Sequence, residues 1–93
     1  MKGTEKQIVW AEELKSKAMD ALNWAKENAP TTKPEEIEVW KNFVGTMADQ
    51  INSIDYAGNV IELLKDANLS GTPDKAAMSV ISTVKRYGKY YIK

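Results

Sequence analysis

Apolar residues recur at steps of three and four along most of the chain, which is the spacing of one face of an α-helix. In the first such segment they are Ile8, Ala11, Leu14, Ala18, Ala21, Leu22 and Ala25. Thr4 and Gln7 form a capping-box pattern before this stripe, and Asn28 and Pro30 end it. The pattern predicts a helix over residues 5–28, and its four alanines allow a neighbouring helix to approach closely.

A second stripe follows Pro34 and is the clearest in the chain. It consists of Ile37, Trp40, Val44, Met47, Ile51 and Ile54, with Phe43 beside it. Thr32 and Glu35 fit a second capping box, and Pro34 suits the first turn of a helix. These features predict a helix over residues 34–52.

The segment after this helix is rich in side chains that bond their own backbone, such as Asn52, Ser53 and Asp55. This composition predicts a break, followed by a shorter helix over residues 55–68. The sequence equally allows the second and third helices to be one bent helix.

The strongest turn signal in the chain precedes the last predicted helix. Gly71 suits a left-handed turn, Thr72 suits an N-cap, and Pro73 suits the first helical position. We expect a helix over residues 73–87 that ends near Gly88, with residues 88–93 as a basic and aromatic tail.

The fold class follows from these four segments. No segment shows sustained alternation with a period of two, so a β-sheet is not expected. The links are short, which favours antiparallel neighbours. The sequence predicts an all-α protein, a compact antiparallel bundle of four helices in a single domain over residues 1–93.

Composition narrows the chemistry that such a bundle can perform. The 93 residues include 13 Lys and Arg against 13 Asp and Glu, and neither His nor Cys occurs. Thiolate and imidazole groups are therefore missing from any catalytic or metal site, and zero net charge gives no global attraction to nucleic acid. We expect a protein that is not an enzyme, with no cofactor and no metal.

Carboxylates are the acid–base groups that remain. They lie on predicted polar faces or in first helical turns, at Glu12, Glu13, Glu35, Glu36, Glu38 and Asp49. Carboxylate-rich metal sites in helical bundles usually add a Glu-x-x-His motif, which this chain lacks. Solvated faces and complements to the helix dipole explain these residues better than an active site does.

The N-terminal segment enters an amphipathic pattern directly, without the apolar core of a signal peptide. No apolar run approaches the roughly 20 residues that span a bilayer. We therefore expect a cytoplasmic protein without a membrane segment.

Several large apolar residues lie away from the predicted core faces. They are Val9, Trp10, Trp24 and Val39. An exposed patch of this kind is typical of a contact with a protein partner or with a second copy of the chain. The alternative is that the first helix packs on two sides within the bundle, which would bury the same residues.

The C-terminal segment is the one place where charge is segregated. It contains Lys85, Arg86, Tyr87, Lys89, Tyr90, Tyr91 and Lys93, with no acidic residue among them. Cations between aromatic rings are what single-stranded nucleic acid requires, charge for the phosphates and rings for the bases. The alternative is structural, because cations at a helix C-terminus offset its dipole and tyrosines can close the end of a bundle.

The opening segment from Gly3 to Leu14 resembles small uncharacterised helical proteins of bacteriophages, prophages and other mobile elements. In those proteins a Gly-Ser/Thr-Glu-Lys-Gln run precedes an apolar-Trp-Ala-Glu helix, as Gly3-Thr4-Glu5-Lys6-Gln7 precedes Val9-Trp10-Ala11-Glu12 here. The resemblance implies that the chain belongs to a phage or mobile element and acts among its small accessory proteins. It implies no catalytic residues.

Two functions follow as hypotheses. The first is a non-catalytic protein–protein interaction or accessory protein of a phage or mobile element that associates with itself. The second is a small nucleic-acid-binding protein that uses the basic, tyrosine-rich C-terminus.

Overall fold

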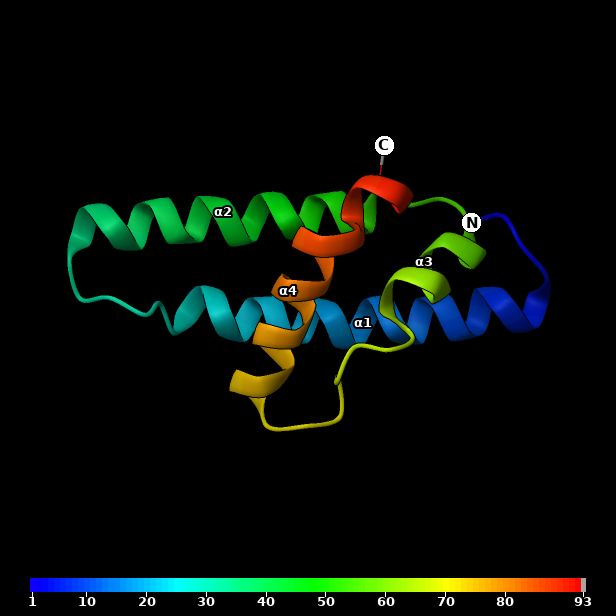
Figure 1. Ribbon diagram of the computed structural model, residues 1–93, viewed down its shortest axis with the longest axis horizontal. Helices are drawn as coiled ribbons and strands as arrows, with labels where there is room; N and C mark the ends of the chain where they lie inside the picture. The colour runs from blue at the N-terminus through cyan, green and yellow to red at the C-terminus, as the bar shows by residue number, and fades with distance from the viewer. Residues whose placement is uncertain (93) are drawn as a thin grey trace.

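The computed structural model describes residues 1–92, and these residues form four helices with no strand (Figure 1). The helices are α1 (Glu5–Glu27), α2 (Pro34–Asn52), α3 (Ala57–Leu64) and α4 (Pro73–Tyr91). The predicted all-α bundle of four helices is confirmed.

Helix α1 is the central element of the bundle, and its 23 residues span about 35 Å. It packs against each of the other three helices, whereas α2 makes only marginal contact with α3 and α4. Figure 1 shows α2 returning antiparallel along α1, with α4 crossing α1 obliquely. All six predicted core positions from Ala11 to Ala25 are buried. Small residues dominate this stripe because several neighbours must approach the same helix.

The start of α1 is fixed by two local devices. Thr4 and Gln7 form the predicted capping box, with hydrogen bonds of 3.2 and 3.0 Å between side chain and backbone. Gly3 adopts a φ of +147°, and a Cβ there would lie 2.9 Å from the Cβ of Ala57. Only glycine meets both conditions without strain, so Gly3 lets the N-terminal residues lie directly against the start of α3.

The second predicted capping box, between Thr32 and Glu35, is wrong. The N-cap of α2 is Lys33, which has extended backbone angles and no side-chain cap. A residue before proline is driven into this extended conformation, so Pro34 sets the boundary one residue later than the box requires. The Thr31 hydroxyl instead donates a 2.7 Å hydrogen bond to the Glu36 carboxylate.

The break between α2 and α3 is real, so the two are not one bent helix. The Lys2 amide donates to the Asp55 carbonyl, and the Ala57 amide donates to the Lys2 carbonyl, both at 2.7 Å. This pairing holds the linker extended, and α3 therefore begins at Ala57 rather than at residue 55.

Helix α3 also ends at Leu64, four residues before the predicted boundary at 68. There the chain turns toward α4, and the Asn68 amide donates a 2.8 Å hydrogen bond to the Ser79 hydroxyl.

A lysine from α1 caps the end of α2. The Lys15 ammonium donates hydrogen bonds to the carbonyls of Asn52 and Ile54, at 3.1 and 2.6 Å. These carbonyls have no partner within a helix, and a cation suits the negative end of the dipole. Partial burial lowers the pKa of Lys15, while the nearby carboxylates of Asp55 and Glu12 oppose the shift.

The predicted end of the last helix near Gly88, with residues 88–93 as a tail, is wrong. Helix α4 continues to Tyr91, and Gly88 is buried inside it. Tyr91 and Ile92 pack against the core, and a Cβ on Gly88 would lie 3.3 Å from side-chain atoms of Ile92 and Val84. Packing of these side chains outweighs the roughly 1 kcal/mol that a helical glycine costs.

A candidate protein-binding groove between α2 and α4

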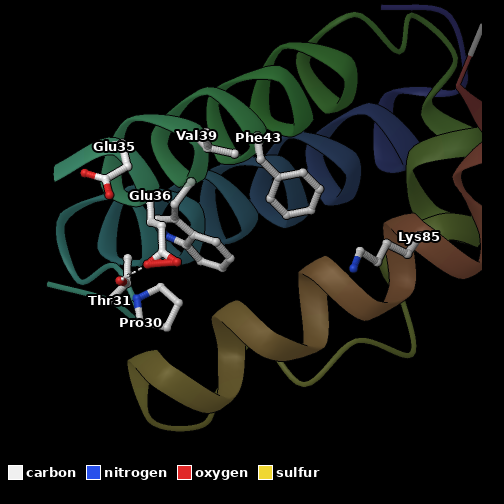
Figure 2. Close-up of a pocket in the computed structure, with 8 residues that line it drawn as sticks. Pro30, Thr31, Glu35, Glu36, Val39, Phe43 and Lys85 are labelled. Atoms are coloured by element: carbon white, nitrogen blue, oxygen red, sulfur yellow. Dashed lines mark hydrogen bonds between the residues drawn. The ribbon is translucent and has the colours of Figure 1, made fainter. Parts of the chain in front are cut away.

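Helices α2 and α4 both pack on α1 but diverge from each other, and a groove of about 730 Å³ opens between them (Figure 2). We call this feature the α2–α4 groove. Its lining residues are Pro30, Thr31, Glu35, Glu36, Val39, Trp40, Phe43 and Lys85. Two further depressions lie beyond Phe43. One follows α2 from Phe43 to Gln50, and the other lies between Gln50 of α2 and Lys89 of α4.

The floor of the α2–α4 groove is aromatic and firmly held. The ring centroids of Trp40 and Phe43 lie 5.8 Å apart, and both side chains are partly buried against the core. The Trp40 indole donates a 2.7 Å hydrogen bond to the carbonyl of Ala25, near the end of α1. This bond satisfies the one polar atom of the ring and fixes its orientation, so the groove presents a preformed apolar surface.

The α2 side of the groove is lined by a second stripe that this helix carries beside its core stripe. This second stripe consists of Glu36, Val39, Phe43, Thr46 and Gln50, again at steps of three and four. Val39 stands at its centre with 68% of its surface exposed, although it is a large apolar residue. The helix therefore offers one apolar face to α1 and a further partly apolar face to the groove.

Charge is separated along the α2–α4 groove. Glu35 and Glu36 lie at the end next to the α1–α2 loop, and Lys85 projects from α4 toward the aromatic floor (Figure 2). The Lys85 ammonium lies 5.4 Å from the centroid of the Phe43 ring, within the range of a cation–π interaction. Lys89 follows one turn later beside Gln50. No ion pair within residues 1–92 involves any of these four charged groups.

The four residues predicted to form an interface do not form one patch. Val39 lies in the α2–α4 groove, whereas Trp24 is partly buried against the core, under the loop between α3 and α4. Val9 and Trp10 are 63% and 48% exposed near the start of α1.

Distances along the helices confirm this separation. The Trp40 side chain bonds to Ala25, which lies sixteen residues after Val9 on α1. Sixteen residues of α-helix span about 24 Å. Val39 adjoins Trp40 in the sequence, so it lies far from Val9. The packing of α1 on several sides explains why Trp24 is partly buried. Of the four predicted interface residues, Val39 is the one that lines the groove.

The residues predicted to contact nucleic acid lie on helix α4, where they separate into three pairs at a spacing of four. Lys85 and Lys89 share the side facing the α2–α4 groove. Arg86 with Tyr90, and Tyr87 with Tyr91, point in two other directions by the helical repeat. The remaining predicted contact, Lys93, lies outside the described residues.

The ionisable groups with shifted pKa values stabilise helix ends and turns rather than the groove. A hydrogen bond from Thr72 lowers the pKa of Asp74 in the first turn of α4. A hydrogen bond to Glu62 raises the pKa of Lys65 at the end of α3. Within the part of the chain that the structure describes, no three carboxylates gather closely enough to hold a metal ion.

The sequence contains a sign of the α2–α4 groove that is missed when residues are sorted only into core and surface. Trp40 is expected to lie in the core, and Phe43 is expected only to flank it. Their role as a groove floor could be found from the second stripe, because Val39 and Phe43 are four residues apart on the same side of α2. The approach of Lys85 to this stripe depends on how α4 crosses α1 and leaves no trace in local sequence.

Comparison with family models, with curated proteins and with solved structures finds no match to this chain. Over residues 1–92, no helix combines the length and the apolar character needed to cross a membrane. The function of the chain is therefore inferred from its own residues.

Proposed function

We propose that this chain is a non-catalytic interaction protein that binds a protein partner through the α2–α4 groove. The observation that carries the proposal is the exposure of Val39, 68%, directly beside the fixed aromatic floor of Trp40 and Phe43. Apolar grooves between helices are a common receptor for an amphipathic helix, and a partner would cover the apolar surface that is now in water.

Composition and resemblance support the same class of function. The chain has neither His nor Cys, and the carboxylates in the groove, Glu35 and Glu36, are exposed to solvent. The resemblance of its opening segment to small phage and mobile-element proteins is consistent with an accessory protein. Gly3, Thr4 and Gln7 of that segment serve the fold, through the tight turn and the capping box, so a partner need not contact them.

A photo-crosslinking amino acid tests the proposed groove. We expect p-benzoyl-phenylalanine at position 39 to form covalent adducts with protein when the chain is irradiated in cells that express it. The same amino acid at position 9 is the matched control, because Val9 is also an exposed valine on a helix but lies far from the groove. Adducts are resolved by gel electrophoresis and identified by mass spectrometry. No protein adduct from position 39, or equal adducts from both positions, would rule out the groove as the binding site.

Nucleic-acid binding is the second candidate, and one observation favours it. Because α4 continues to Tyr91, the exposed cations Lys75, Lys85, Arg86 and Lys89 all fall within a sector of about 100° on one continuous helix. A line of cations of this kind can follow a phosphate backbone.

Salt-dependent binding of fluorescent oligonucleotides tests this second candidate. Arg86→Gln is expected to weaken binding to single-stranded DNA and to lower the salt slope by about 1, because one phosphate contact is lost. Lys41→Gln on α2 is the control and is expected to bind as the wild type does. Absence of binding at low salt for the wild-type chain rejects nucleic acid as the ligand.

A further inference from the structure

The order of charges along the α2–α4 groove indicates which protein occupies it. The groove is acidic at one end, at Glu35 and Glu36, and basic along α4, at Lys85 and Lys89. A second copy of the chain carries the same order of charges, so a two-fold rotation places each acidic end against a basic end. We propose, on the basis of the function proposed above, that the α2–α4 groove is the interface of a symmetric homodimer in which the two α2 helices run antiparallel.

The register of the dimer follows from the spacing on α2. An antiparallel pairing centred between Val39 and Trp40 sets Glu36 of one copy opposite Phe43 of the other. Lys85 lies over Phe43 within each chain, 5.4 Å from the ring centroid. Glu36 therefore meets Lys85 of the second copy, and the two-fold axis repeats the pair on the other side. A self-complementary contact of this kind is what a two-fold interface requires.

Apolar surface drives the association. Val39 from each copy enters the groove of the other copy and covers the aromatic floor, which removes an exposed valine from water. Met78 is 60% exposed and lies seven residues before Lys85, so it shares the side of α4 that faces the groove. On this side of α4 it adds apolar surface that the second copy would cover.

Long-range electrostatics do not oppose the contact between two copies. The formal net charge of the chain is zero, so two copies experience no overall repulsion. In addition, the four groove charges form no ion pair within residues 1–92, so each is free to pair across the interface.

Charge reversal of one residue at a time tests the homodimer. We expect wild-type protein to sediment as a dimer in the micromolar range. Both Glu36→Lys and Lys85→Glu should weaken the dimer at least about tenfold, since each places like charges opposite one another twice. A mixture of the two variants should recover dimers, because both pairs in the mixed dimer are then opposite in charge. The lysine introduced by Glu36→Lys faces the glutamate introduced by Lys85→Glu, and the unchanged Lys85 of the first chain faces the unchanged Glu36 of the second. Both pairs join two different chains, so the recovery cannot arise from a contact inside one chain.

A matched control separates the groove from general charge effects. Glu38→Lys and Arg86→Glu make the same charge changes on exposed positions of α2 and α4 that do not line the groove. These variants are expected to dimerise as the wild type does, and circular dichroism should show that all four variants are folded.

Three results overturn the homodimer: a wild-type monomer across the micromolar range, a dimer that neither groove variant weakens, or a mixture that does not recover. The homodimer and the proposed function can fail separately. If position 39 crosslinks only to a different protein while the chain sediments as a monomer, the homodimer is wrong and the groove still binds protein.

Discussion

Replacement of Leu22 by alanine is expected to lower the free energy of unfolding by about 2–5 kcal/mol. Leu22 is fully buried on α1, the helix that packs against the other three. Because α1 is held between three helices, the surrounding structure can collapse only in part into the cavity left by the substitution. A domain of this size has only about 5–15 kcal/mol of stability, and the melting temperature should fall by at least about 10 °C. Chemical denaturation followed by circular dichroism measures the loss.

Val9→Ala is the matched control for this substitution. Val9 lies on the same helix, but 63% of its surface is exposed, so its truncation is expected to change stability by no more than about 0.5 kcal/mol. If the two substitutions had equal effects, Leu22 could not occupy the centre of the core.

Replacement of Ala18 by leucine is expected to destabilise the protein by about 1–3 kcal/mol, although it adds apolar volume. Ala11, Ala18 and Ala25 follow one another at intervals of seven on α1, and Ala18 has no exposed surface. A longer side chain at this position must displace a neighbouring helix or adopt a strained rotamer. The midpoint of urea denaturation reports the change.

Ser16→Leu distinguishes overpacking from an effect of leucine itself. Ser16 lies on the exposed face of α1 two residues before Ala18, and leucine is a good helix former. This control is expected to leave stability nearly unchanged. A gain in stability from Ala18→Leu would mean that the helices around α1 have room for a larger residue.

Both predictions depend on residues whose burial could be predicted from the sequence. Leu22 and Ala18 lie on the first apolar stripe. Apolar residues at steps of three and four share one face of a helix, and that face packs against the core. The capping box of Thr4 and Gln7 was predictable for the same reason, since its hydrogen bonds join residues three positions apart.

Boundaries were less predictable where distant residues decide them. The start of α3 depends on Lys2, which pairs with Asp55 and Ala57 across more than fifty residues of chain. The extension of α4 past Gly88 depends on the packing of Tyr91 and Ile92 against the core. Local propensity correctly marks both regions as weak helix formers, but tertiary contacts set where each helix begins and ends.

The sequence by itself determined that this protein is a bundle of four helices without thiol or imidazole chemistry, because periodicity and composition are local properties of the chain. Only the tertiary structure decided where the apolar residues outside the core stripes lie. It buried Trp24 in part, left Val9 and Trp10 exposed near the start of α1, and placed Val39 in a groove with Trp40, Phe43 and Lys85. The physical reason is that a groove forms where two helices diverge on a third, and the angle of that divergence is set by packing across the whole bundle.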